Sequence, residues 1–304
     1  MLLIQSSSLE VEILPEVGGK IGQIRDRESG YELLIPPQKP YRTIPEDGNW
    51  TEYDTSGMDD CFPNIAAGPY PFPPWTGTEL PDLGHWPHGS WDVCEADASQ
   101  VTLERQARFL PHRARKLIHF IDATTLELSY ALENCGESPF GYMWAAHPLI
   151  SVVPEFGLAL PPGNLSFRTF PPDKQVHSWP FYASPLHESI DLSREWIPGG
   201  SDLKIFLTGM REGWCELQLP SHTLRFTFDL SETPVLGIWF NHFGFPQHSP
   251  RPFRCIAIEP CTSPSDLLSD LRADEYRTVK PGGIDRWSVR LQICSKNRPG
   301  SGGK

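Results

Sequence analysis

The sequence lacks the features that would point to a membrane or a nucleic acid. No apolar run approaches the ~18 residues that a helix needs to cross a bilayer, and the opening segment, MLLIQSSSLE, lacks the positive charge and long apolar core of a secretory signal. Lys and Arg total 26 against 38 Asp and Glu, a formal net charge of −12, so no excess of cations is available for phosphate backbones or anionic lipids. We expect a soluble, cytoplasmic protein that binds neither nucleic acid nor membranes.

The cysteines form no disulfide or metal pattern. There are seven of them, without a CxxC motif, and an odd number is a poor basis for a disulfide framework. His85 and His88 lie three residues apart in a proline-broken loop but lack the glutamate of the HExxH zinc motif. The sequence therefore predicts free thiols in a reducing compartment and no metal site.

What the sequence has in abundance is proline, with 32 residues, and glycine, with 25. Proline is at about twice its usual ~5% share, which argues against a helical bundle because proline breaks helices. Loops rich in both residues, notably 36–48 and 69–81, separate segments that alternate strictly between apolar and polar residues. Such alternation is typical of half-buried strands, and it occurs over residues 9–13, 126–132, 224–230 and 287–293.

These strands span nearly the whole chain, without a repeat or a composition break that would mark a linker. The one helix start is Ser263-Pro264, a cap residue followed by proline and then by leucines on one face. The final segment, SKNRPGSGGK, has the composition of a disordered end. We predict an all-β protein: one large, twisted antiparallel β-sandwich domain over residues 1–294 with few short helices, and a disordered tail over 295–304.

Two histidines stand in unusual settings. His147 lies in FGYMWAAHPLIS, where the following proline favours extended backbone, so we expect it at the end of a strand. His88 lies in PHGSW, where Gly89 would let backbone or a ligand approach closely. Either side chain can transfer a proton at neutral pH, because the ordinary histidine pKa is ~6.5. Either can equally be a buried structural histidine, and the residues alone leave both interpretations open.

Two further segments carry groups that suit a sugar site. In CIAIEPCTSPSD, Glu259 ends an apolar strand, and burial there would raise the pKa of its carboxyl, as a general base requires. The alternative is that Glu259 caps the loop before Ser263. In GIWFNHFGFPQH, Trp239 offers an aromatic face and Asn241 offers an amide for hydroxyl groups, although Trp239 and Phe243 can also be ordinary core residues.

Taken in order, five motifs of this chain resemble the aldose 1-epimerase family, the galactose-mutarotase-like proteins. They are LPEVGGKIGQIRDRESGYELL, GMDDCFPNI, PHGSW, LSYALENCGESPFGYMWAAHPL and IAIEPCTSPSD, and the resemblance runs from about Leu9 to Ile293. It implies a single-domain supersandwich of twisted antiparallel sheets with a sugar cleft on a concave face. It also implies an isomerase of carbohydrate metabolism, free of cofactor and metal, that interconverts the α and β anomers of a sugar.

The resemblance implies roles for individual residues as well. Glu259 matches the base that removes the proton of the anomeric hydroxyl, and His147 matches the acid that protonates the ring oxygen. The opened sugar then recloses from its other face. His88 matches the histidine that holds the ring oxygen or a neighbouring hydroxyl. The residues expected to bind the substrate are thus His88, Asn241, Asp60, Asn64 and Trp239.

Two positions depart from the family pattern. The segment GMDDCFPN carries Asp59, Asp60 and Asn64 where many relatives have an arginine. No counterpart of the family's substrate-binding aspartate is found, a task that Asn241 could perform. The identity of the sugar therefore stays open. The alternatives to an epimerase are a carbohydrate-binding protein without turnover and another sugar isomerase or lyase on the same sandwich, since a fold does not fix a function.

Overall fold

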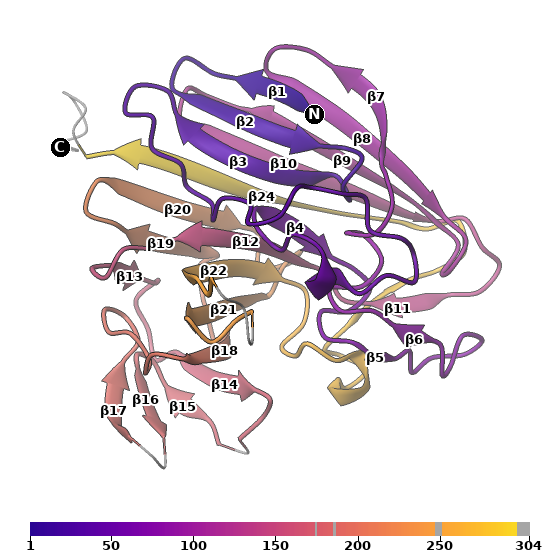
Figure 1. The fold of residues 1–304 in the computed structure, drawn as a ribbon. Helices are drawn as coiled ribbons and strands as arrows, with labels where there is room; N and C mark the ends of the chain where they lie inside the picture. The colour runs from indigo at the N-terminus through magenta and orange to yellow at the C-terminus, as the bar shows by residue number, and fades with distance from the viewer. Residues whose placement is uncertain (174, 185–186, 247–250, 297–304) are drawn as a thin grey trace.

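The protein is built almost entirely from antiparallel strands that form two large sheets (Figure 1). In Figure 1 the strands β1 to β3 lie over β8 to β10 of the second sheet, and β14 to β17 lie at the opposite end of the molecule. This arrangement confirms the predicted all-β antiparallel sandwich. The computed structural model describes residues 1–173, 175–184, 187–246 and 251–296.

The ten-stranded sheet carries the first four strands of the chain along one edge. Its order is β1 (Leu2–Gln5), β2 (Leu9–Leu14), β3 (Lys20–Asp26), β4 (Met58–Cys61), β12 (Ala145–Ser151), β22 (Arg254–Cys261), β21 (Val235–His242), β18 (Ser201–Thr208), β14 (Ser166–Phe170) and β15 (His177–Ser178). The eight-stranded sheet has the order β13 (Gly157–Ala159), β19 (Trp214–Gln218), β20 (His222–Phe228), β24 (Ile284–Ser295), β10 (Thr125–Asn134), β9 (His112–Phe120), β8 (Gln100–Ala107) and β7 (Asp92–Ala96). The remaining strand pairs are β5 (Gly68–Pro69) with β6 (Glu79–Leu80), β11 (Phe140–Tyr142) with β23 (Arg277–Val279), and β16 (Phe181–Ser184) with β17 (His187–Asp191).

The four alternating segments of the sequence form β2, β10, β20 and β24. The four apolar residues expected to be buried in β10 are at most 3% exposed, whereas the residues between them are half-buried. Alternation predicts burial because successive side chains of a strand point to opposite faces of the sheet. Leu230 is an exception, because β20 ends at Phe228 and the residue follows in a turn.

A stack of aromatic rings fills part of the core between the sheets. Trp287 stacks on Trp86, with ring centroids 6.3 Å apart, and on Tyr130, at 5.4 Å. Trp144 packs against Tyr130 at 4.8 Å and against Trp287 at 5.4 Å. Because Trp144 immediately precedes Ala145, the first residue of β12, this core fixes the start of the strand that carries His147.

The helix predicted at Ser263-Pro264 is wrong. Residues 262–266 form bends, and a single 3₁₀ turn, η2 (Leu268–Asp270), follows after Leu267. Backbone groups that a helix would pair internally are bonded elsewhere, since the carbonyl of Asp266 accepts from the amides of residues 65 and 66. Long-range hydrogen bonds outweigh the local helix signal here, because a short helix has little stability of its own.

The strand β24 ends at Ser295, one residue inside the segment expected to be disordered, and residues 297–304 lie outside the described residues. The other helical turn in the described ranges is η1 (Trp50–Glu52), whose first turn is capped by the side chain of Asn49. Among the residues that the structure describes, no helix is long and apolar enough to cross a membrane.

A buried ion pair between Lys116 and Asp60 connects the two sheets. Lys116 of β9 donates to Asp60 of β4, with Nζ 2.6 Å from Oδ2, and the Tyr130 hydroxyl donates to the other carboxylate oxygen at 2.7 Å. The Lys116 and Asp60 side chains are 1% and 2% exposed. Water therefore cannot replace either partner if one of them is removed.

We expect Lys116→Met to lower the free energy of unfolding by about 3–5 kcal/mol, because it leaves the Asp60 carboxylate buried without its cation. The double variant Lys116→Met with Asp60→Asn leaves no isolated charge, so it should recover most of that loss. Urea unfolding at neutral pH, followed by tryptophan fluorescence, measures both. Equal losses in the single and double variants would contradict this account of the pair.

Candidate functional site

One face of the ten-stranded sheet carries a row of ionisable side chains. Asp59 of β4 pairs directly with His147 of β12. The residues two positions before and after His147 pair with β22 residues on either side of Glu259, so His147 and Glu259 are level and share a face. Lys20 ends the row on one side, with Nζ 3.1 Å from Asp59 Oδ2, and Lys204 ends it on the other in an ion pair with Glu259.

A pocket of about 270 Å³ opens over this row. Part of its wall is aromatic: Trp50 stacks on Phe245 with ring centroids 5.9 Å apart, and Trp239 stacks on His147 at 6.0 Å. Aromatic rings offer large, rigid contact faces to a ligand. The lining residues are Trp50, Ile65, Ala66, Asp82, Leu83, His147, Phe170, Pro171, Asp202, Lys204, Trp239, Phe245 and Asp266.

Glu259 is fully buried in the middle of the row. Its Oε2 accepts a hydrogen bond from Lys204 Nζ, and its Oε1 has no hydrogen-bond partner among the described residues. Burial raises the pKa of Glu259 to about 7, although Lys204 opposes this rise, and Asp266 adds to it. The carboxyl therefore changes its protonation state near neutral pH, as a general base must.

His147 differs from an ordinary histidine because it stays neutral. It is 7% exposed, and its Nδ1 has no hydrogen-bond partner among the described residues. Burial, together with the cations Lys204 and Lys20, lowers the pKa of His147 to about 3. A neutral imidazole offers one N–H donor and one acceptor, so His147 carries no additional proton at pH 7.

Lys204 is not among the residues that the sequence singles out, yet it lines the pocket and contacts Glu259. Burial alone would lower the pKa of Lys204, but Glu259 and Asp266 raise it above its ordinary value, so the ammonium stays charged. A signal for this residue was present in the sequence. Lys204 lies between Leu203 and Ile205 in an apolar strand, and a charge in such a strand must find a partner.

Three aspartates add carboxylates to the pocket wall. Asp266 Oδ1 lies 3.8 Å from Lys204 Nζ. Burial raises the pKa of Asp82 to about 6, and the nearby Asp266 contributes to that rise. Asp202 accepts a hydrogen bond of 3.2 Å from the indole N–H of Trp239. The described lining residues include no arginine, so they do not offer the bidentate guanidinium that favours a phosphate.

Of the residues expected to bind the substrate, Trp239 lines the pocket and Asn241 does not. The Asn241 amide donates to the backbone carbonyls of Phe245 and Phe253, at 2.8 and 3.0 Å. Its side-chain oxygen accepts from the amides of Gly244 and Phe245. Asn241 therefore shapes the loop that presents Phe245 to the pocket.

His88 and Asn64 also lie outside the pocket lining. His88 is buried, with Nδ1 2.9 Å from the carbonyl oxygen of Pro45, and burial lowers its pKa. Asn64 donates to the carbonyls of Ala66 and Pro81, at 2.6 and 3.0 Å. Asn64 thus ties together two loops of the pocket wall from behind.

Asp60 is separated from the pocket by its own strand. Consecutive residues of a strand point to opposite faces, so Asp60 enters the core beside Lys116, and Asp59 takes the place next to His147. The structure therefore brings together His147, Glu259 and Trp239 from the expected set.

The histidines His85 and His88 lie near each other, outside the lining of the pocket. Their ring centroids are 6.3 Å apart, and the His85 ring packs against Phe109. Within the described parts of the chain, no three side chains of His, Cys, Asp or Glu gather closely enough to hold a metal ion.

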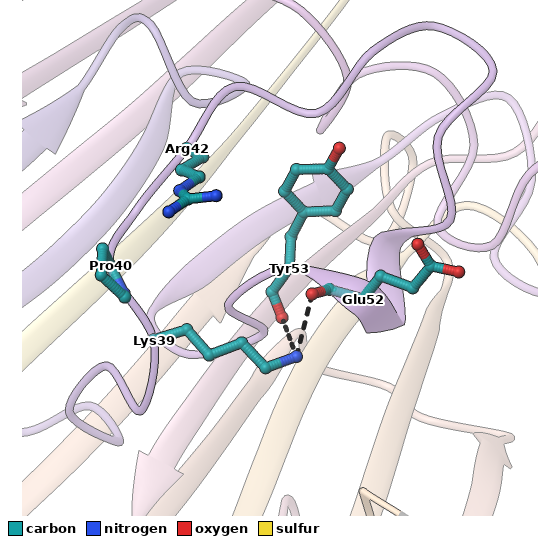
Figure 2. Close-up of a pocket in the computed structure, with 5 residues that line it drawn as sticks. All are labelled: Lys39, Pro40, Arg42, Glu52 and Tyr53. Carbon is teal, nitrogen blue, oxygen red and sulfur yellow. Dashed lines mark hydrogen bonds between the residues drawn. The ribbon is translucent and has the colours of Figure 1, made fainter.

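A second hollow, of about 390 Å³, is formed by Lys39, Pro40, Arg42, Glu52 and Tyr53 (Figure 2). Figure 2 shows the Lys39 ammonium turned to the backbone, with Nζ 2.9 Å from the carbonyl oxygen of Glu52 and 3.3 Å from that of Tyr53. The Lys39 ammonium is thus already hydrogen-bonded, and the residues that the structure describes around this hollow include no histidine and no buried carboxylate. The pocket over Glu259 is the stronger candidate site.

No family model and no curated protein matches the chain, but several solved structures do. A galactose mutarotase-like protein from Lactobacillus casei ATCC 334 is 17% identical, with a TM-score of 0.70 over 97% of this chain and 100% of that chain. A galactose mutarotase related enzyme from Lactobacillus acidophilus is 13% identical, with a TM-score of 0.68 over 97% of each chain. A galactose mutarotase-like protein from Clostridium acetobutylicum is 13% identical, with a TM-score of 0.66 over 96% of this chain and 94% of that chain. The chain therefore has the fold of these galactose mutarotase-like proteins along nearly its whole length.

The raised pKa of Glu259 has a measurable effect on stability. The folded protein keeps this proton up to about pH 7, whereas the unfolded chain releases it near the ordinary value of 4.5. Stability gained from the proton is therefore lost as the pH rises through that window. Relative to Glu259→Gln, which cannot titrate, the wild type should lose roughly 1 kcal/mol of unfolding free energy per pH unit between about pH 5 and 6.5. Urea unfolding across this range measures the difference, and parallel pH dependences would argue against the raised pKa.

Proposed function

We propose that the protein is an aldose 1-epimerase-like isomerase that interconverts the α and β anomers of a small sugar. The observation that carries the proposal is a buried carboxyl with a pKa of about 7, Glu259, which lies level with a neutral histidine at an aromatic-walled pocket. The fold shared with galactose mutarotase-like structures supports the same function. The resemblance of the motifs around His147 and Glu259 to aldose 1-epimerases agrees with it.

Glu259 is the proposed base. As a carboxylate it accepts the proton of the anomeric hydroxyl, while the bond between C1 and the ring oxygen breaks and C1 becomes an aldehyde. A pKa of about 7 suits this task, because a base works best when its pKa lies near the working pH. Oε1 is the acceptor available for the proton, since Oε2 is engaged by Lys204.

His147 is the proposed acid, and it acts from its neutral form. The ring oxygen must gain a proton as its bond to C1 breaks, and the N–H of His147 supplies it. Lys20 and Lys204 disfavour an imidazolium, and the same positive charges favour the imidazolate that this transfer produces. A neutral histidine that polarises a substrate oxygen is an established catalytic device.

Ring closure reverses both transfers. Rotation about the bond between C1 and C2 turns the other face of the aldehyde to the hydroxyl oxygen, which attacks C1. Glu259 returns its proton to the new anomeric oxygen, and His147 recovers its proton from the closing hydroxyl. Protons and electrons balance, and the protein ends as it began.

A carbohydrate-binding protein without turnover is the second candidate. One observation favours it: the Glu259 side chain is 0% exposed and is not part of the pocket lining, whereas Lys204 is. In this conformation a bound sugar would meet Lys204 before Glu259. Turnover and simple binding are separated by whether a pure anomer equilibrates faster when the protein is added.

The proposal is tested with a panel of freshly dissolved pure anomers of neutral aldoses, followed by polarimetry and NMR with and without protein. At least one aldose should equilibrate faster with the wild type. Glu259→Gln should bind that sugar nearly as well but lose on the order of 10²-fold or more in kcat, because it cannot accept the anomeric proton. Binding without acceleration by the wild type would favour the carbohydrate-binding protein, and an active Gln variant would exclude Glu259 as the base.

The neutral state of His147 makes a prediction for pH dependence. The wild-type kcat/KM should rise once, through the pKa of Glu259 at about 7, and should show no second limb from an imidazolium losing its proton. His147→Ala should lower kcat by on the order of 10²-fold, the lower range for positioned proton transfer, and keep the same acid limb. A bell-shaped wild-type profile that loses its alkaline limb in His147→Ala would mean that the histidine acts as a cation instead.

A further inference from the structure

Lys204 and Glu259 belong to strands that are not neighbours. In the ten-stranded sheet β21 lies between β22, which carries Glu259, and β18, which carries Lys204. The lysine side chain must therefore cross β21 to reach the carboxylate. It does so diagonally, because its direct partner on β21 is Trp239, whereas the partner of Glu259 is Gly237.

Gly237 makes this crossing possible. A Cβ atom at this position would lie 3.3 Å from Glu259 Cβ and 3.4 Å from Lys204 Cε. A larger side chain would occupy the space through which the lysine passes. Lys204, Gly237 and Glu259 thus form one contact unit across three strands, here called the crossed pair.

The crossed pair holds the carboxylate in one arrangement. Oε2 accepts from the lysine ammonium, and Oε1 has no hydrogen-bond partner among the described residues. The Lys204 ammonium also lies 3.8 Å from Asp266 Oδ1, so two carboxylates, those of Glu259 and Asp266, attract it. One oxygen of Glu259 is fixed, and the other is left as a proton acceptor.

We propose that Lys204 is the positioning residue of the base: it reaches across Gly237, binds Oε2 of Glu259 and favours the ionised carboxylate, so that Oε1 is the oxygen left to accept the anomeric proton once a sugar reaches it. This inference rests on the proposed function, since it assigns to Lys204 a task in that reaction. Lys204 acts through Glu259 and transfers no proton itself.

The other ionisable groups that the structure describes around Glu259 do not supply a cation that contacts its carboxylate. From β12 it is faced by His147, which is neutral, and from β4 by Asp59, whose own cation is Lys20. From the loop after β22 it is faced by Asp266, a further carboxyl. Burial also raises the thiol pKa values of the nearby cysteines, so these groups stay neutral at working pH: Cys61 of β4, and Cys255 and Cys261 of β22. Among these described neighbours Lys204 is the cation that contacts the carboxylate.

The first experiment observes Glu259 directly and needs no sugar. Protein labelled with ¹³C at the glutamate carboxyl is titrated by NMR, and the Glu259 signal is identified by its absence in Glu259→Gln. In Lys204→Met the titration should move to higher pH by about 1–2 units, because an opposite charge in contact has been removed. Lys204→Arg, which keeps the charge, should move it much less.

The second experiment measures catalysis with the aldose that shows the largest acceleration in the anomer panel. In Lys204→Met the acid limb of kcat/KM should move to higher pH by the same amount as the titration. At pH 6 this corresponds to a loss of about 10- to 100-fold, and the loss should shrink as the pH approaches 9. A lysine that only stabilised the fold would lower the rate equally at every pH.

Gly237→Ala tests the same unit without removing a charge, and it covers the case in which Lys204→Met fails to fold. Crowding of the lysine should move the Glu259 titration upward, in the same direction as Lys204→Met. The matched control is Arg277→Met, which removes a partly buried ion pair whose residues are not part of the pocket lining, with Arg277 Nη2 2.5 Å from Asp285 Oδ1. It should leave the Glu259 titration and the acid limb unchanged.

The outcomes separate the two proposals. An unchanged titration in both Lys204→Met and Gly237→Ala would overturn the positioning role, whatever the enzyme's activity. The Glu259 titration could move as expected in a protein that accelerates no aldose. That result would confirm the contact between Lys204 and Glu259, but it would reject both the proposed function and the catalytic task of Lys204. A shift in Arg277→Met equal to that in Lys204→Met would also overturn the assignment, because the effect would then not be specific to the crossed pair.

Discussion

The structure depends on the pairing of two consecutive aspartates in the short strand β4 with lysines from different strands. Because a strand alternates its faces, Asp60 points into the core and meets Lys116 of the opposite sheet, whereas Asp59 points to the outer face and meets Lys20. Both pairs are almost fully buried. Such pairs specify an arrangement more than they stabilise it, since a buried charge that loses its partner is costly. One strand of four residues thus aligns the two sheets and defines one side of the pocket floor.

The same electrostatics set the protonation states on that floor. Cations stand at both ends of the row, Lys20 on one side and Lys204 on the other, with His147 and Glu259 between them. Burial and both cations lower the pKa of His147, whereas burial raises the pKa of Glu259 and Lys204 lowers it. The result is a neutral imidazole beside a carboxyl that titrates near pH 7. The ordinary pKa of a histidine, 6.5, lies above that of a glutamate, 4.5, and the surroundings of these two side chains reverse that order.

Much of the fold could be predicted from the sequence, because strand alternation is a local signal. β10 shows it well, with apolar residues at every second position and burial to match. His147 and Trp239, two of the residues singled out in the sequence, line the pocket, and Glu259 lies beneath it. The helix after Cys261 could not be predicted correctly, because backbone groups there bond to a loop some two hundred residues earlier in the chain, at residues 65 and 66. Whether Asp59 or Asp60 lies beside the pocket depends on which face of β4 is the outer one. The local sequence does not encode this.

Lys204 shows a different limit of sequence analysis. The contacts of Lys204 are made with residues of two other strands. No local sequence pattern links the lysine in LKIFLT to the glycine in VLGIWF or to the glutamate in IAIEP. Asn241 shows the converse, because an amide next to aromatic residues suggests a sugar ligand, yet its amide makes four hydrogen bonds to backbone groups of its own loop and of Phe253.

The passage of a lysine over a glycine also has an evolutionary consequence. Positions 204, 237 and 259 lie on three strands, yet they share one small volume, so a change at any of them alters what the other two can do. Relatives that keep the lysine should keep the glycine, and relatives with a larger residue at position 237 should have lost the lysine as well. The three positions are therefore expected to covary in an alignment. The residue at position 237 would then separate relatives in which a lysine binds the carboxylate at position 259 from relatives in which another group does so.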